Sequence, residues 1–147
     1  MTGRPRVPPA DGQSLVEFAL VFPVFLLLLF GLIDIGRFVY TANAVSEAAR
    51  EGARFGSVVA NCGTNREACV EAETHDRLAA VAGATVTAGC TRYVVTQARW
   101  VPATGGCQTN DLLKVEVSTR FQVLTPIVGQ LLGGALIQGS SQVTVNQ

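Results

Sequence analysis

The pattern of apolar and polar residues divides this chain near residue 33. From Leu15 to Ile33 every residue is nonpolar except Glu17. At about 1.5 Å per residue a helix of this length covers roughly 28 Å, close to the hydrocarbon thickness of a bilayer. No second apolar run of this length exists, so the pattern predicts a single membrane-spanning helix over about residues 15–33. Because an ionisable group is costly at that depth, Glu17 is a candidate functional residue that needs a partner.

The helical pattern continues past the apolar run and predicts one long helix over residues 13–59, with a kink near Pro23. Beyond the membrane, Ala48, Gly52 and Gly56 recur every four residues and form a stripe where another backbone can approach closely. This stripe fits two alternatives equally well. It packs either on the chain's own sheet or on another subunit.

The second half of the chain has shorter elements and alternating patterns. A capping box at Thr64–Glu67 predicts a helix that runs to about Ala82 and stops at Gly83. The clearest strand is 113–123, where Leu113, Val115, Val117, Phe121 and Val123 face one way and polar residues the other, as in a sheet with one buried face. Further expected elements are strands at 84–88 and 93–100, a short helix from Thr125 to Leu132, and a last strand or hairpin arm within 135–146.

These elements predict an α+β, pilin-like fold, in which a long N-terminal transmembrane helix is followed by a small antiparallel sheet domain with one or two short helices. Three parts are expected: a cytoplasmic leader at 1–12, the long helix at 13–59, and an extracytoplasmic α+β domain at 60–147. The leader carries Arg4 and Arg6, which favours a cytoplasmic N-terminus, but Arg37, Arg50 and Arg54 follow the apolar run, so charge alone does not decide the orientation. The net charge of the 147 residues is zero, so no basic surface indicates nucleic-acid binding.

Four cysteines indicate an oxidising compartment for the C-terminal part, with the N-terminus inside the cell and the domain outside. Three pairings are possible, and the local one, Cys62–Cys69 with Cys90–Cys107, is favoured because each pair brackets a junction or turn. Zinc is not expected, since the cysteine spacings are unsuitable and the chain has one histidine. No other metal or cofactor is predicted.

Gly12, four residues, and then Glu17-Phe18 at the start of an apolar helix resemble the processing motif of type IV pilins and pseudopilins. The continuation is more specific, because Pro23, Asp34-Ile-Gly-Arg37 and the Ala48–Arg54 run follow in order. Together these residues resemble the TadE-like family of the Tad (Flp) pilus system. The resemblance is strong over Gly12–Gly56 and looser over 115–133.

The resemblance implies a minor pilin or pseudopilin, which is a substrate of an enzyme rather than an enzyme itself. A prepilin peptidase would cut between Gly12 and Gln13, leaving Glu17 as the fifth residue of the mature chain. The new amino group of Gln13 could then pair with Glu17 of a neighbouring subunit. Phe18 belongs to the same motif. The expected partners are the peptidase, other pilin subunits, Tad assembly proteins and the cytoplasmic membrane, with incorporation into the pilus.

Asp34 and Arg37 match the family pattern, so they are candidates for an assembly role, and an ordinary helix pair is the alternative interpretation. Ser14 to Glu17 can likewise be interpreted as a capping box at a helix start. A signal peptide cut after Ala44 is another alternative for the apolar run.

Two other functions compete with the pilin. One is a monomeric, single-pass, membrane-anchored binding domain whose apolar helix is only an anchor. The other is an envelope hydrolase, which would need a catalytic constellation. His75 and Asp76 do not supply one, because adjacent helical residues do not face each other.

Overall fold

The computed structural model describes residues 11–59, 62, 65–125 and 134–146. Its dominant element is helix α1, Asp11–Val58, whose 48 residues correspond to a length of about 72 Å. The other elements are helix α2 (Arg66–Asp76), strand β1 (Thr85–Val94), the one-turn helix η1 (Val95–Gln97), and strands β2 (Arg99–Pro102), β3 (Leu112–Phe121) and β4 (Ala135–Thr144). The long helix that the sequence predicts is confirmed, and it remains continuous through Pro23.

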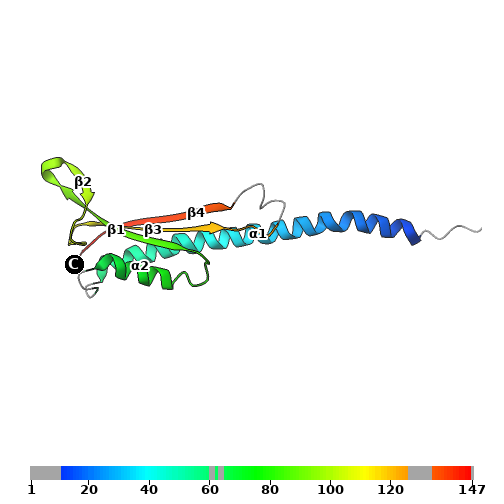
Figure 1. Cartoon of the computed structure of the whole chain (residues 1–147), viewed down its shortest axis with the longest axis horizontal. Helices are drawn as coiled ribbons and strands as arrows, with labels where there is room; N and C mark the ends of the chain where they lie inside the picture. The colour runs from blue at the N-terminus through cyan, green and yellow to red at the C-terminus, as the bar shows by residue number, and fades with distance from the viewer. Residues whose placement is uncertain (1–10, 60–61, 63–64, 126–133, 147) are drawn as a thin grey trace, which may run out of the picture.

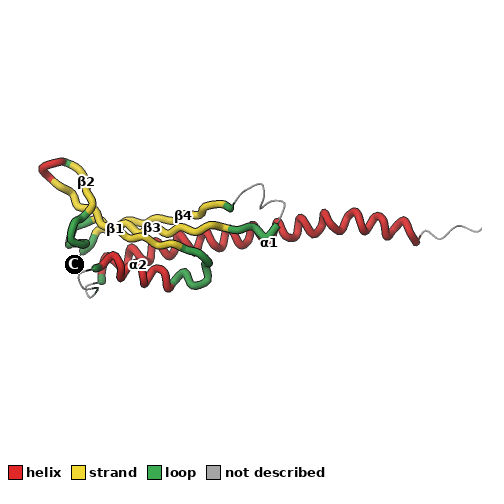
Figure 2. Tube along the Cα trace, viewed as in Figure 1, coloured by secondary structure: helices red, strands yellow, loops and turns green. Residues whose placement is uncertain are grey.

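The four strands form one antiparallel sheet in the order β2-β1-β3-β4. The sheet lies along one half of α1, and α2 packs on α1 and β1 (Figure 1). The other half of α1 extends beyond the domain as a bare helix (Figure 2). We call residues 11–33 the free half of α1. The predicted α+β arrangement is therefore confirmed.

The core consists of small α1 residues packed against larger strand residues. Val45, Ala49 and Ala53 are fully or almost fully buried on α1. They belong to one cluster with the inward-facing residues of β3, which are Leu113, Val115, Val117 and Phe121. This is the alternating face that the sequence predicts for residues 113–123.

Glycines set how closely the elements approach α1. A Cβ added at Gly139 of β4 would lie 2.9 Å from the carbonyl oxygen of Val45, so only glycine allows this crossing. Added Cβ atoms at Gly52 and Gly56 would meet side chains of α2 and β3. The small-residue stripe on α1 is thus covered by the chain's own domain, which decides between the two alternatives.

Helix α2 is shorter than predicted and has a different cap. It ends at Asp76, not Ala82, because the chain then makes tight turns in which Leu78 N–H donates to His75 and Val81 N–H donates to Leu78. The hydroxyl of Thr119 donates to the carbonyl of Ala82 at 3.1 Å, which holds the chain where it turns towards β1. The N-cap is Asn65, whose side chain accepts from Ala68 N–H at 3.2 Å, while Thr64 lies outside the described residues.

The strands predicted at 84–88 and 93–100 are also revised. One continuous strand, β1, spans most of the first segment and ends two residues into the second, and the rest of segment 93–100 contains the turn of a hairpin and the start of β2. Ala98 adopts the left-handed conformation there, and Tyr93 pairs with Trp100 across the hairpin with ring centroids 5.5 Å apart. Because the turn contains no glycine, the sequence pattern did not predict a turn within 93–100. The last predicted strand is confirmed as β4, and the short helix predicted from Thr125 falls on residues 126–133, outside the described residues.

One edge of the sheet is protected by carboxylates of α2. Over residues 85–90 strand β1 pairs with β3 on one side only, because β2 covers β1 from Thr91 onward. On the open side, Ala88 N–H donates to Glu71 at 2.9 Å and Cys90 N–H donates to Glu67 at 3.2 Å. These bonds satisfy the N–H groups of Ala88 and Cys90, which would otherwise be free to pair with another strand.

Candidate functional site

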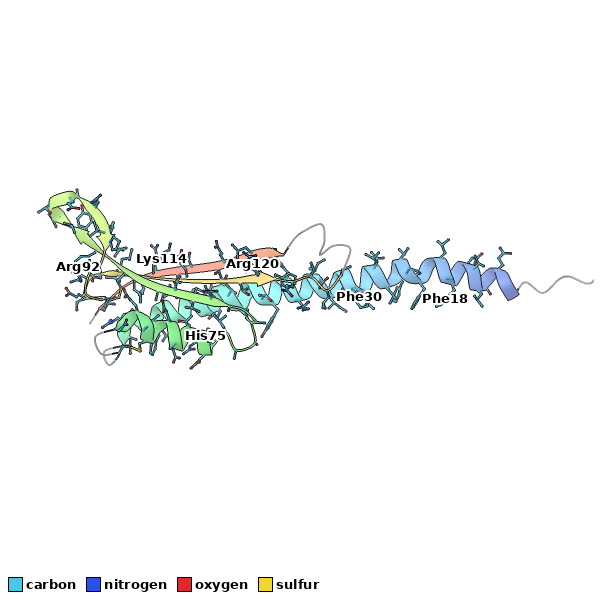
Figure 3. The ribbon with its side chains drawn as sticks, viewed as in Figure 1. Phe18, Phe30, His75, Arg92, Lys114 and Arg120 are labelled. Atoms are coloured by element: carbon cyan, nitrogen blue, oxygen red, sulfur yellow. A yellow bond between two sulfur atoms is a disulfide. The ribbon has the colours of Figure 1, made fainter. Side chains whose placement is uncertain are left out.

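The free half of α1 is apolar and uncovered by the domain. Its large side chains, with Phe18 and Phe30 labelled in Figure 3, project away from the helix in several directions. In the most apolar 18-residue window of α1 only 6% of the residues are buried, which is unlike the core helix of a soluble protein. A helix of this length and composition fits a single-pass membrane anchor.

The predicted processing site lies at the start of α1. A Cβ added at Gly12 would meet no atom of the described residues within 4 Å, so packing within this part of the chain does not require glycine here. Gln13 is exposed next to it in the first turns of the helix. Glycine is also a poor helix former, by about 1 kcal/mol relative to alanine, so the first turn unwinds readily. The bond between Gly12 and Gln13 therefore lies on the exposed surface of a helix end that glycine stabilises poorly.

Glu17 is exposed one turn further along, and no other described residue forms an ion pair or hydrogen bond with it. The capping-box interpretation of Ser14 and Glu17 is wrong for this chain, because the backbone is already helical at Asp11 and Ser14 lies inside α1. Phe18 stacks on Phe22 with ring centroids 5.2 Å apart. Glu17 thus has no structural role within the described part of the subunit.

The signal-peptide interpretation also conflicts with the fold. Ala42 and Ala44 lie in the middle of α1, and Ala42 packs against the core of the domain. A cut after Ala44 would divide the helix on which the sheet rests. The helix that carries the apolar run is part of the folded domain.

Asp34 lies one residue beyond the apolar run and ties the sheet to α1. Only 6% of the residue is exposed, and its carboxylate accepts three hydrogen bonds from the segment that follows β3. The donors are the backbone N–H of Leu124 at 3.0 Å, the backbone N–H of Thr125 at 3.1 Å and the hydroxyl of Thr125 at 2.7 Å. We call this arrangement the Asp34 clamp. Arg37 adds an ion pair at 3.4 Å, which is long and half exposed.

The Asp34 clamp changes the interpretation of the Asp34–Arg37 pair. The two residues form the expected pair. The stronger hydrogen-bond partners of Asp34, however, are Leu124 and Thr125, which lie about ninety residues later in the sequence. The hydrogen bond from Leu124, followed by that from the Thr125 hydroxyl, lowers the pKa of Asp34 from its ordinary value despite burial. Next to it, Phe38 packs edge-on against Phe121 at 5.5 Å, and the Arg37 guanidinium lies over the same Phe121 ring. The sequence offered no signal for this long-range contact.

Replacing Asp34 with asparagine should release the segment after β3. The new NH₂ group would face N–H donors in place of an acceptor oxygen, and a hydrogen bond to a charged group would be lost. We expect amide exchange of peptides containing Leu124 and Thr125 to accelerate by about tenfold or more, measured by hydrogen–deuterium exchange in detergent. Arg37→Gln is the matched control, because it removes a partly exposed ion pair and the contact with the Phe121 ring but leaves the three hydrogen bonds of the clamp in place, so it should change exchange little. Equal exchange in wild type and Asp34→Asn would contradict the clamp.

The opposite end of the domain is held by two disulfides and a buried ion pair. The bonds Cys62–Cys69 and Cys90–Cys107 are those that the sequence favours, with Cα atoms 5.7 and 5.4 Å apart. Arg92, labelled in Figure 3, binds both carboxylate oxygens of Asp111 at 2.7 and 2.6 Å. Asp111 is 2% exposed and also accepts from Gln108 N–H at 2.7 Å. Sequence reasoning missed this pair.

The chemistry of the remaining polar groups is limited. Atoms of Glu67, Cys90 and Cys107 lie within 4.8 Å of one another, but both sulfurs belong to the disulfide and cannot act as thiolate ligands. His75 and Asp76 are exposed on α2, and Figure 3 shows His75 on the side away from the sheet. These groups do not converge on a site for bound substrate or metal.

The buried carboxylates of Asp34 and Asp111 should make the free energy of unfolding depend on pH. The hydrogen bond from Arg92 lowers the pKa of Asp111, as Leu124 and Thr125 lower that of Asp34. Since both folded-state pKa values lie below the unfolded value of about 3.9, the stabilisation is present above that pH and is lost as the pH falls through the folded pKa values. We expect the thermal midpoint of the full chain in detergent to fall below about pH 4. The fall should be smaller in Asp111→Asn, and an equal fall in both proteins would contradict this assignment.

The geometry defines a class of protein: a long apolar helix, bare over its first half, that carries a small disulfide-bonded α+β domain on its second half. A family model described as TadE-like protein matches residues 12–54, which confirms the family resemblance of the N-terminal segment. The match covers nearly all of the free half of α1, Asp34 and most of the helix under the sheet, and it indicates a Tad pilus-related protein. Comparisons with curated proteins and with solved structures found no match.

Proposed function

We propose that this chain is a minor pilin or pseudopilin of a Tad-type (Flp) pilus or of a related secretion apparatus. It is a substrate of a prepilin peptidase and not itself an enzyme. The observation that carries the proposal is the free half of α1, which bears an accessible Gly12 and a Glu17 that has no partner among the described residues, both within the segment that matches the TadE-like family. The described part of the subunit gives neither residue a role in the fold.

In this proposal residues 15–33 span the cytoplasmic membrane, with the leader 1–12 inside and the domain 60–147 outside. The two disulfides support this orientation, since such bonds persist in oxidising compartments. The sheet covers only the part of α1 beyond the apolar run, so it does not obstruct lateral contacts of the free half within the membrane.

Cutting after Gly12 gives Glu17 a partner. The peptidase would leave an α-amino group on Gln13, four residues before Glu17 and near the cytoplasmic edge of the membrane. A carboxylate and an ammonium group are each costly in a low-dielectric medium, and pairing between neighbouring subunits offsets much of this cost. Pairing also sets the axial register of the incoming subunit, because the two groups meet at one relative position of the helices.

A helix-swap experiment separates this proposal from a monomeric membrane-anchored domain. In cells lacking the native copy, residues 13–33 are replaced by a polyleucine segment of the same length. If α1 were only an anchor, the swapped chain would restore pilus formation as well as wild type does. The proposal predicts that the swapped protein reaches the membrane with intact disulfides but restores no pili, as counted by electron microscopy.

A further inference from the structure

The membrane-proximal end of the sheet lies beside the first turns of α1 beyond the apolar run. The Asp34 clamp places Leu124 and Thr125 at the level of Asp34, and Phe121 contacts Phe38 one turn later. At about 1.5 Å per residue, Asp34 and Phe38 lie within roughly 8 Å of Ile33 along the helix. The headgroup layer of a bilayer is about 5–8 Å thick on each side. If residues 15–33 span the hydrocarbon, this end of the sheet lies in the headgroup layer.

The side chains at this end are unusually apolar for a surface. Leu124 is 61% exposed and Leu136, near the start of β4, is 59% exposed. Ile35 and Phe38 of α1 are exposed at the same level. We call these four residues the proximal rim. An apolar groove of about 340 Å³, lined by Ile35, Phe38, Val123 and Ala135 among others, opens beside them.

The charges near the proximal rim suit a phospholipid surface. The one carboxylate at this level among the described residues, Asp34, is already satisfied by the clamp and by Arg37. Arg37 is half exposed, and Arg120, opposite Leu136 in the sheet, projects from the outer face at the same end (Figure 3). Apolar side chains with neighbouring guanidinium groups are the combination that inserts at a headgroup layer and binds phosphate oxygens.

We propose that the proximal rim docks into the outer headgroup layer of the membrane and holds the domain against the bilayer before assembly. The inference rests on the proposed anchoring by residues 15–33, with which the rim is continuous. The partner is the phospholipid surface itself.

Tryptophan quenching by brominated lipid tests this contact. The chain has one tryptophan, Trp100, which is exposed on the β2 hairpin at the far end of the domain. In a Trp100→Phe background, Leu124→Trp places a reporter on the proximal rim and leaves the backbone N–H of the clamp in place. The full chain is reconstituted into vesicles of phosphatidylcholine brominated near the headgroup end of its acyl chains. We expect the reporter at 124 to lose about half its emission or more, since a docked side chain lies about 5–10 Å into the interface.

Two controls make the result decisive. Native Trp100 should be quenched little, and Leu28→Trp combined with Trp100→Phe should be quenched strongly because residue 28 lies in the apolar run. Leu136→Trp is the second rim reporter if Leu124→Trp does not retain both disulfides and a cooperative thermal transition. Quenching at 28 without quenching at the rim would overturn the docking alone. A rim reporter with blue-shifted but unquenched emission would also overturn it, because a second copy would then cover the rim. Absence of quenching at 28 would overturn the anchoring as well.

Discussion

Cells that produce Gly12→Ile as their sole copy are expected to accumulate the uncut chain and to form no pili. A Cβ at residue 12 meets no neighbour within 4 Å, so the substitution leaves the fold of the subunit intact. The peptidase, however, must accept the side chain that directly precedes the bond it cuts. A β-branched residue there also restricts the backbone that has to leave the helix before cutting. The effect should therefore fall on processing and not on folding.

Gly31→Ile is the matched control for Gly12→Ile. Gly31 lies on the same helix, and an added Cβ there also meets nothing within 4 Å. Both variants should show wild-type thermal midpoints and intact disulfides, and only Gly12→Ile should retain the leader by intact mass. Complete processing of Gly12→Ile, or loss of processing in both variants, would contradict the proposal that the peptidase recognises residue 12.

Glu17→Gln is expected to separate processing from assembly. The leader should still be removed, because the cut bond is unchanged, but the mature subunit should stay in the membrane and pili should be lost. The amide keeps the shape of the side chain and removes the charge that would meet the amino group of Gln13. Since Glu17 has no partner among the described residues of its own chain, the thermal midpoint should not change.

Moving the carboxylate tests whether its position matters. The double variant Val16→Glu, Glu17→Gln keeps the same charge but rotates it by about 100° around the helix. If Glu17 pairs with a neighbouring subunit in a fixed register, this variant should fail to assemble as Glu17→Gln does. Normal pili from Glu17→Gln would show that the electrostatic pairing is not needed. Normal pili from the double variant alone would show that the pairing does not require a fixed register.

Much of the fold follows from local sequence patterns. The apolar run and the small residues that follow at every fourth position indicate α1, and the alternation over 113–123 indicates β3, because each of these patterns is local in the sequence. The favoured disulfides also follow from local geometry, since each pair brackets one turn or junction. The match of Gly12, Glu17 and Phe18 to a pilin motif required only their spacing.

The features that the sequence did not reveal are contacts between distant segments. Asp34 and Thr125 meet because the sheet lies back along α1, and nothing in either local sequence encodes that register. The pair of Arg92 with Asp111 depends in the same way on how β1 and the segment before β3 approach. The hairpin between β1 and β2 was missed because its turn uses Ala98 in the left-handed conformation, where glycine or asparagine is the usual signal.

The most direct test of the central claim is intact-mass and N-terminal peptide mass spectrometry of the protein from its native membranes. The account predicts a chain that begins at Gln13 and contains two disulfides, with no peptide from residues 1–12. A chain that still begins at Met1 while pili form normally would contradict prepilin processing. The monomeric membrane-anchored domain would then be the better description of this protein.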